Sequence, residues 1–167
     1  MPDAPGLELI RGEIEQDHPD AILDTGFDRG GATLVVDPEQ VLDVLRWLRD
    51  APGQGYCFLS SLHAADYLPA SPRFGVHYEL LNRDRVERLR VKAMLGEDPE
   101  IDSCVELFPT ADFQEREAYD MFGIVFKGHP DLTRILLPDD YVGWPQRRDF
   151  PVGGEPVTFT YNEGDRG

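Results

Sequence analysis

Apolar residues recur at helical spacing in two stretches of the first 53 residues. The first, residues 7–16, predicts a helix that buries Leu7, Ile10 and Ile14. The second begins at Asp37-Pro38-Glu39, where an acid suited to capping a helix precedes a proline at its first position. This second helix should end at the Ala-Pro-Gly of residues 51–53. Its inward positions are Val41, Leu42, Leu45 and Leu48.

Five other stretches have the short, β-rich or alternating pattern that is typical of strands. They cover residues 21–27, 32–36, 56–67, 74–81 and 85–94. The turn at residues 28–31 joins the first two into a hairpin. The fifth alternates apolar residues with Arg88, Arg90 and Lys92, so we expect it at an edge of the sheet with its charges outward.

Residues 101–122 predict two helices separated by a break at Pro109. The first is short and covers residues 101–108, and the second carries Glu115. Arg116 and Asp120 are four residues apart on the second helix, so we expect them to pair on one face. The residues that share the neighbouring face at helical spacing are Glu115, Ala118, Tyr119 and Phe122.

Gly123 follows this helix where a C-cap glycine would end it. Residues 124–126 then predict a short extended piece. His129-Pro130 interrupts any regular element, because a residue that precedes proline is disfavoured in the helical region. Asp131 is placed to cap a second short helix, whose apolar positions are Leu132, Ile135 and Leu136.

Together these elements predict an α+β fold: a mixed β-sheet with helices on one face, then a helix and an extended proline-rich C-terminal arm. We divide the chain into a sheet domain (1–108), the helix and His-Pro-Asp turn (109–137) and an extended interface arm (138–167). The proline density after Gly123 favours an arm draped over a partner, the alternative being an arm that packs on its own domain. The arm's candidate interface anchors are Trp144, Phe150, Phe159 and Tyr161.

The net charge and the cysteine content reduce the number of function classes that fit this chain. Thirty-two acidic against 16 basic residues give a net charge of −16, which argues against nucleic-acid binding, since that needs a basic surface. The acidic surface either serves solubility or faces basic partner subunits. Cys57 and Cys104 lie far apart without a C-x-x-C motif, so we expect neither an iron–sulfur cluster nor a zinc site on this chain. No signal peptide and no apolar run of membrane-spanning length are visible, which predicts a cytoplasmic or peripheral protein.

Familiar catalytic patterns are missing from the sequence. It has no G-x-G-x-x-G, Walker, H-E-x-x-H or G-x-S-x-G motif. His63 and Asp66 have an odd spacing, which puts them on opposite faces of a strand and argues against a catalytic pair. Glu115 and Glu117 point about 200° apart around a helix, so they cannot share one metal ion. We therefore expect no catalytic, cofactor or metal residues here.

The sequence from Phe113 to Pro151 closely resembles the signature of the C subunit of NADH-quinone oxidoreductase, the 30 kDa subunit family of respiratory complex I. The resemblance is carried by Glu115-Arg116-Glu117, Asp120, Met121-Phe122, His129, Ile135-Leu136, the run from Leu136 to Tyr141, and the run from Arg147 to Pro151. Thr133 departs from the family, which usually has a basic residue or proline there, so a contact of that charge is either absent or supplied by Arg134.

The resemblance implies a non-catalytic peripheral-arm subunit of a proton-translocating NADH:quinone oxidoreductase. FMN, iron–sulfur clusters and quinone would all lie on partner subunits. The implied partners are the quinone-site, D-like subunit and the terminal iron–sulfur, B-like subunit, on the cytoplasmic side of the cell membrane. Arg116, Glu117 and Asp120 would form a partly buried charge network. The residues implied at contacts between subunits are Glu115, Arg116, Glu117, Asp120, Phe122, Gly123, His129, Pro130, Asp131, Arg134, Arg147, Arg148 and Asp149.

Two alternatives remain open at this point. A membrane-bound hydrogenase or a ferredoxin- or F420-linked complex would use a similar subunit, so the electron donor and the quinone type are not fixed by the sequence. A freestanding metal-dependent hydrolase that uses the carboxylates belongs to a different class. It would behave as a self-sufficient monomer with bound metal, whereas the subunit would purify with large partners.

Overall fold

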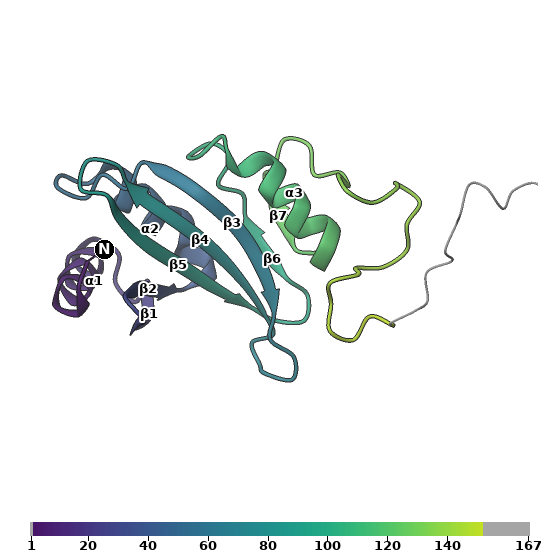
Figure 1. Cartoon of the computed structure of the whole chain (residues 1–167), viewed down its shortest axis with the longest axis horizontal. Coiled ribbons are helices and arrows are strands. Elements are labelled where there is room, and N and C mark those ends of the chain that lie inside the picture. Colours follow the sequence, from purple (N-terminus) through teal and green to yellow (C-terminus); the bar gives the residue numbers. More distant parts are fainter. Residues whose placement is uncertain (1, 152–167) are drawn as a thin grey trace, which may run out of the picture.

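The computed structural model describes residues 2–151 of the chain. A five-stranded mixed sheet forms its centre, in the order β1-β2-β5-β4-β3, and helices lie against one face (Figure 1). The predicted α+β class is confirmed. The strands of this sheet are β1 (Ile22–Asp28), β2 (Gly31–Val36), β3 (Phe58–Asp66), β4 (Phe74–Asn82) and β5 (Glu87–Leu95).

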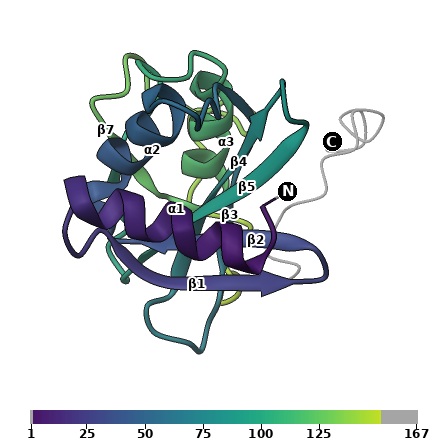
Figure 2. The ribbon, with the colours of Figure 1, turned by 90° about the vertical axis from the view of Figure 1, so that its left-hand side faces the viewer.

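The N-terminal helices form where the apolar spacing predicted them. Helix α1 (Ala4–Asp17) is capped by Asp3, buries the predicted apolar positions and lies against the β1–β2 hairpin (Figure 2). Asp37 caps a short 3-10 turn, η1 (Pro38–Gln40), that leads into α2 (Val41–Asp50). The inward side chains of both helices meet those of β2, β4 and β5 in one hydrophobic core.

Strand β5 lies in the middle of the sheet, so the prediction of an edge position was wrong. It pairs in parallel with β2 and antiparallel with β4. Leu89, Val91 and Ala93 are fully buried on the inner face, while Arg88 and Arg90 are exposed on the outer face. Alternating apolar and charged residues indicate that one face of a strand is exposed to solvent. A central strand also has one exposed face when helices cover only the other face of the sheet, so the pattern does not identify an edge strand.

The predicted helix over residues 101–108 was also wrong. Residues 100–102 form a short strand, β6 (Glu100–Asp102), that pairs in parallel with β7 (Val125–Lys127). Ile101 and Phe126 are neighbours in this pairing, and both are buried. A pairing with a segment 25 residues away overrides the local helical spacing, since burial in the core stabilises the extended form.

Helix α3 (Ala111–Phe122) covers the free edge of the sheet at β3. The side chain of Gln114 accepts a hydrogen bond from the backbone N–H of Leu62, which is one of the edge groups that a sixth strand would otherwise satisfy. Thr110 Oγ1 donates to the carbonyl of Leu59 nearby, at 3.4 Å. The helix that carries the family signature is therefore fixed to the sheet through its N-terminal part.

Candidate functional site

The charged residues of α3 divide between the inside and the outside of the molecule. Glu115 and Asp120 have no exposed surface, Arg116 is partly exposed and Glu117 is exposed. Asp120 does not pair with Arg116, so the expected network of Arg116, Glu117 and Asp120 does not form. The helical register was right, but the segment after the helix supplies the charge that Asp120 needs.

Arg134 is that partner, and we call the arrangement the helix clamp: Asp120, Arg134 and the backbone N–H groups of residues 135–137. Arg134 Nη1 donates to Asp120 Oδ1 at 2.6 Å. Asp120 Oδ2 accepts three hydrogen bonds, from the N–H groups of Ile135 (3.1 Å), Leu136 (2.8 Å) and Leu137 (2.9 Å). Burial alone would raise the pKa of Asp120, but Arg134 and the three amides outweigh it and lower this pKa below its ordinary value.

The helix clamp explains why the short helix predicted after Asp131 is absent. Residues 131–137 form no regular element. Three consecutive N–H groups converge on one carboxylate oxygen, which requires a turn around Asp120 instead of a continuing helix. The prediction was wrong because a single buried carboxylate satisfies these amides better than a short helix with frayed ends would.

Arg134 also reaches forward to the arm. Its Nη2 donates to the carbonyl oxygens of Tyr141 (3.0 Å) and Gly143 (3.1 Å). Its guanidinium group lies over the ring of Trp144, 4.6 Å from the centroid. Arg134 Nη1 also donates to the carbonyl of Asp120 at 3.2 Å, so the guanidinium group serves four acceptors, more than the three N–H donors of a lysine ammonium group.

Arg116 contacts the same segment from the outer side of α3. Its guanidinium group donates to the carbonyl and hydroxyl oxygens of Thr133 (3.2 and 3.0 Å) and to the carbonyl of Arg134 (3.1 Å). Thr133, the residue that departs from the family pattern, thus accepts from Arg116 through its side chain. Glu117 is exposed to solvent on the same helix.

Glu115 and His129 form a second polar group under α3. Glu115 Oε1 accepts from the N–H of Cys104 at 2.8 Å, and Oε2 has no hydrogen-bond partner among residues 2–151. His129 Nδ1 accepts from the N–H of Asp131, so Nε2 carries the proton and donates to the carbonyl of Asp112 at 3.2 Å. Burial raises the pKa of Glu115, opposed by hydrogen bonds from Ser103 and Cys104.

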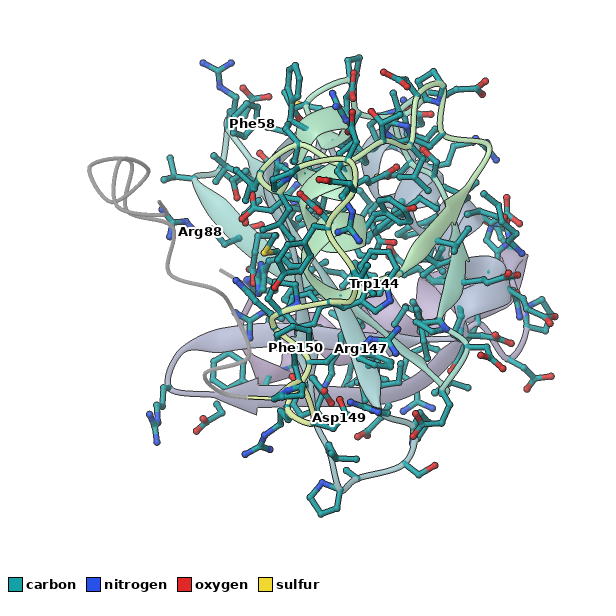
Figure 3. All side chains as sticks on the ribbon, turned by 90° about the vertical axis from the view of Figure 1, so that its right-hand side faces the viewer. Phe58, Arg88, Trp144, Arg147, Asp149 and Phe150 are labelled. Carbon is teal, nitrogen blue, oxygen red and sulfur yellow. The ribbon has the colours of Figure 1, made fainter. Side chains whose placement is uncertain are left out.

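The end of α3 is shaped to receive the arm. Gly123 adopts a left-handed conformation with φ +73, as predicted for a C-cap glycine. A Cβ atom there would lie 2.5 Å from Trp144, so the indole ring packs where only glycine leaves room. Arg147 Nε donates to the carbonyl of Phe122 at 2.7 Å, which satisfies one of the free carbonyls at the helix end. Figure 3 shows these arm residues along this side of the molecule.

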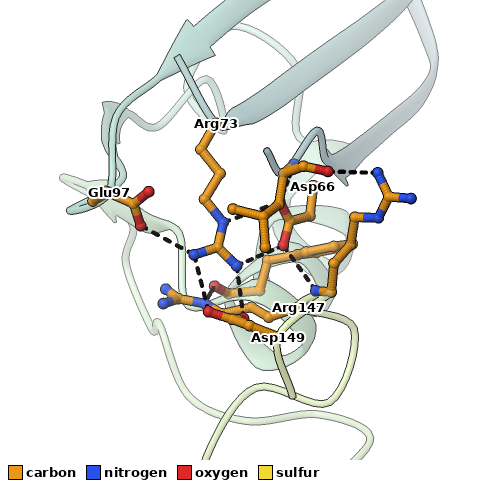
Figure 4. Close-up of polar contacts among 8 residues, drawn as sticks. Asp66, Arg73, Glu97, Arg147 and Asp149 are labelled. Atoms are coloured by element: carbon orange, nitrogen blue, oxygen red, sulfur yellow. Dashed lines mark hydrogen bonds and ion pairs between the residues drawn. The ribbon is translucent and has the colours of Figure 1, made fainter. Parts of the chain in front are cut away.

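A second set of ion pairs, the sheet clamp, joins the arm to the sheet and consists of Asp66, Arg73 and Asp149 (Figure 4). Arg73 is 4% exposed and donates to both carboxylates, with closest distances of 2.7 Å to each, and also to the exposed Glu97 at 3.0 Å. Asp66 also accepts from the N–H of Arg148 at 2.8 Å. Hydrogen bonds from Arg73 lower the pKa values of Asp66 and Asp149 and raise that of Arg73.

The described part of the arm, residues 138–151, therefore packs on its own domain, which was the open alternative to an arm draped over a partner. Trp144 contributes to this packing by contacting Tyr119 of α3 edge-on. Phe150 stacks on Tyr141 within the arm. Phe159 and Tyr161 lie outside the described residues. The division at residues 108 and 137 stays a prediction, as do the interface roles of the signature residues.

Sequence reasoning missed Arg73 entirely. It stands in a loop between two strands, and its partner Asp149 is 76 residues away, so no local spacing connects them. Asp66 was considered only as a partner of His63, and the odd spacing places the two on opposite faces of β3. The one available signal was the run Arg147-Arg148-Asp149, which shows that the arm is charged but does not show which residue of the sheet domain it would pair with.

The geometry of these groups favours a structural role over catalysis. Most acidic and basic side chains of the site donate to or accept from the chain itself. Across residues 2–151, no three histidine, cysteine or acidic side chains gather in a way that would hold a metal ion. No helix in the same range is both long and apolar enough to cross a membrane.

Comparisons with known proteins agree with the signature. Residues 34–156 match the family model described as the 30 kDa subunit of the respiratory-chain NADH dehydrogenase. The chain is 47% identical over 146 residues to the C subunit of the NADH-quinone oxidoreductase of Roseiflexus castenholzii, covering 87% of this chain and 84% of that protein. It is 48% identical over 143 residues to the same subunit of Citrifermentans bemidjiense, covering 85% and 88%.

One solved structure shares the fold at lower sequence identity. It is a chain of the membrane-bound sulfane sulfur reductase, an archaeal respiratory membrane complex. The TM-score is 0.70 at 23% identity, with 87% of this chain and 85% of that chain covered. The matched family region includes α3, both clamps and the described arm, so the chain belongs to the family of the 30 kDa subunit of the respiratory-chain NADH dehydrogenase.

Proposed function

We propose that this protein is the peripheral-arm C subunit of a proton-translocating NADH:quinone oxidoreductase. Its activity is that of the assembled complex, and the isolated chain is not catalytic. The observation that carries the proposal is the family match over residues 34–156, with relatives that bear the name of this subunit and align over most of their own length. The hydrogenase-type and hydrolase alternatives have no comparable support.

Within that complex the chain acts as a scaffold. It holds the quinone-site, D-like subunit and the terminal iron–sulfur, B-like subunit in register on the cytoplasmic side of the membrane. FMN, the iron–sulfur clusters and quinone are carried by those and other partner subunits. The clamps support this role, since a subunit that positions others must first fix its own surface, and here buried ion pairs fix α3 and the arm as one unit.

Purification from native membranes tests the proposal. A chain tagged before Pro2 should co-elute with the other subunits of the oxidoreductase and with NADH:quinone activity, and mass spectrometry should identify the D-like and B-like subunits. The chain purified alone should show no visible absorbance and no stoichiometric metal. A lone monomer in the membrane extract, or a stoichiometric flavin or iron–sulfur spectrum on the isolated chain, would overturn it.

A further inference from the structure

The outer face of the five-stranded sheet, opposite α2, differs from the rest of the molecule in its charged residues. In Figure 1 strands β4 and β5 lie in front of α2, and among residues 2–151 no helix lies over their outer face. The outward side chains are mainly polar or charged, and those of Arg88, Arg90 and His63 are exposed. This face was not part of the signature and takes no part in either clamp.

Basic residues gather on this face although the chain as a whole is strongly acidic. Arg88, Arg90 and Lys92 occupy alternate positions of β5, in a protein with a net charge of −16. Arg90 pairs with Glu79 on β4, and Lys92 lies 4.3 Å from the centroid of the Tyr67 ring. Within residues 2–151, the side chain of Arg88 has no ion-pair or hydrogen-bond partner, and it reaches outward in Figure 3.

A hollow of about 620 Å³ lies beside this basic row, between the β1–β2 turn and strands β4 and β5. Its lining includes Thr33, Tyr67 and His77, and its charged residues are Arg29 and the three basic side chains against Asp28 and Glu79, so basic residues outnumber acidic ones. His77 is 6% exposed, and its Nδ1 has no hydrogen-bond partner among the described residues, while Nε2 lies 3.0 Å from the hydroxyl of Tyr67. The hollow therefore has a positive wall and an unsatisfied polar group in its lining.

His77 adds no charge to this face. Burial, and after it the neighbouring His63 and the charges of Lys92 and Arg90, lowers the pKa of His77 to about 3, so its ring is neutral at pH 7. The basic row on β5 is therefore the feature of this face that favours a negative occupant. A nucleic acid is not supported as that occupant, because three cations on one strand form a much smaller basic surface than nucleic-acid binding uses.

We propose that this outer face, the basic row of Arg88, Arg90 and Lys92 with the adjoining hollow, docks an extended acidic segment of a neighbouring subunit. Alternate side chains of a strand repeat about every 6.6 Å, and an extended peptide repeats its own alternate side chains at nearly the same spacing. Carboxylates at alternate positions of such a segment can thus meet the three cations in register. The inference rests on the proposed function, since it places the partner within the same complex.

Site-specific photo-crosslinking identifies the occupant directly. A photoreactive amino acid at Thr33, which lines the hollow, is compared in the native complex with the same residue at Leu9, which is 69% exposed on α1. From Thr33, and not from Leu9, we expect crosslinks to a peptide of another subunit in which acidic residues alternate. Crosslinks to residues 152–167 of its own chain, to lipid, to a non-acidic segment or to nothing would overturn the inference.

A charge-reversal pair provides the second test. Arg88→Glu places an acid on the basic row, and Arg83→Glu makes the same change in the exposed turn before β5. At 0.15 M salt we expect the Arg88 variant to lower the amount of chain recovered in the complex about tenfold, and the Arg83 variant less than about twofold. Equal recovery of both would overturn the inference. Matching thermal unfolding curves for the two purified variants confirm that folding is unaffected.

The wild-type chain separates the two proposals. If wild-type protein co-purifies with the oxidoreductase while Arg88→Glu assembles normally, the docking face is wrong and the proposed function stands. If wild-type protein does not co-purify with the oxidoreductase subunits, the proposed function fails and the inference fails with it.

Discussion

The helix clamp and the sheet clamp hold the same segment of chain by different physical means. In the helix clamp, Asp120 is fully buried and is satisfied by one arginine and three amides 14–17 residues further along the chain. In the sheet clamp, Arg73 bridges a buried acid, Asp66, and an acid whose side chain is 53% exposed, Asp149. Water can compete for the second interaction but not for the first.

This difference suggests a division of labour along the arm. The helix clamp fixes where the arm leaves α3, because releasing it would strand a buried charge. The sheet clamp ties down the far end through an ion pair that solvent screens. The arm can then open at residue 149 while its root at residue 134 stays in place. Substitutions that separate the two clamps should show this ordering.

The largest effect is expected from Asp120→Ala. It leaves Arg134 without its carboxylate and three amides without their acceptor, so we expect a loss of about 3–5 kcal/mol in the free energy of unfolding. Urea unfolding followed by circular dichroism measures it. Asp43→Ala removes the exposed Asp43–Arg46 pair of α2 instead and should change stability by less than about 0.5 kcal/mol. Similar losses for the two variants would contradict a buried clamp.

The pH dependence gives the same clamp a second readout. The pKa of Asp120 is lower in the folded than in the unfolded state, so its contribution is fully present above the unfolded value of about 3.9. It is lost as the pH falls through the lower, folded value. The stability gap between wild type and Asp120→Ala should therefore narrow on acidification below about pH 4, and a gap that widened there would reverse our assignment.

The sheet clamp should show a marked asymmetry between its members. Arg73→Ala strands Asp66 inside the domain, and we expect it to cost about 3 kcal/mol or more of unfolding free energy. Asp149→Asn removes only an exposed partner and leaves Arg73 paired with Asp66 and Glu97, so the unfolding midpoint should move little while the arm near residue 149 exchanges its amide hydrogens faster. Hydrogen–deuterium exchange with peptide resolution distinguishes the two. Equal destabilisation by both variants would mean that the arm end is part of the core.

Gly123→Ala tests the packing of the arm root without touching a charge. A left-handed conformation costs an alanine about 1–2 kcal/mol, and the added Cβ meets Trp144. We expect that loss together with a change in tryptophan fluorescence. Gly12→Ala is the matched control, because Gly12 lies in α1 with nothing within 4 Å of an added Cβ, and it should stabilise by about 0.5–1 kcal/mol. The same sign for both would contradict the arm geometry.

Much of the fold was predictable because its signals are local. The caps at Asp37 and Gly123 and the apolar spacing of Leu7, Ile10 and Ile14 each depend on neighbours within a turn or two, and each prediction was confirmed. The failures are non-local. The strand at residue 101 depends on residue 126, and the position of β5 depends on a parallel pairing with β2.

The residues of the site also divide into those predictable from local spacing and those that depend on distant parts of the chain. Spacing alone placed Asp120 on the correct helix, and the resemblance picked out Arg134, but neither showed that the two would pair. The nearest oppositely charged side chain at helical spacing was Arg116, and the sequence favoured it. Three backbone amides of the following loop also donate to the Asp120 carboxylate, and this loop conformation brings Arg134 close to it. Residue spacing along the helix does not predict the conformation of that loop.

Substitution of Arg116 should therefore have the smallest effect on stability. It is also the sharpest test of whether the outer face of α3 differs from the buried helix clamp. As a surface-side donor to Thr133 and the carbonyl of Arg134, it donates to neutral acceptors and neutralises no buried acid. Arg116→Ala should then cost about 1 kcal/mol, well below Asp120→Ala, and Arg116→Lys should recover only part of it, because an ammonium group cannot reproduce the fork. Both are measured by urea unfolding. A loss of about 3 kcal/mol or more from Arg116→Ala, equal to that of Asp120→Ala, would mean that Arg116 belongs to a buried charge network. The inner and outer faces of α3 would then not differ in how their charged residues contribute to stability.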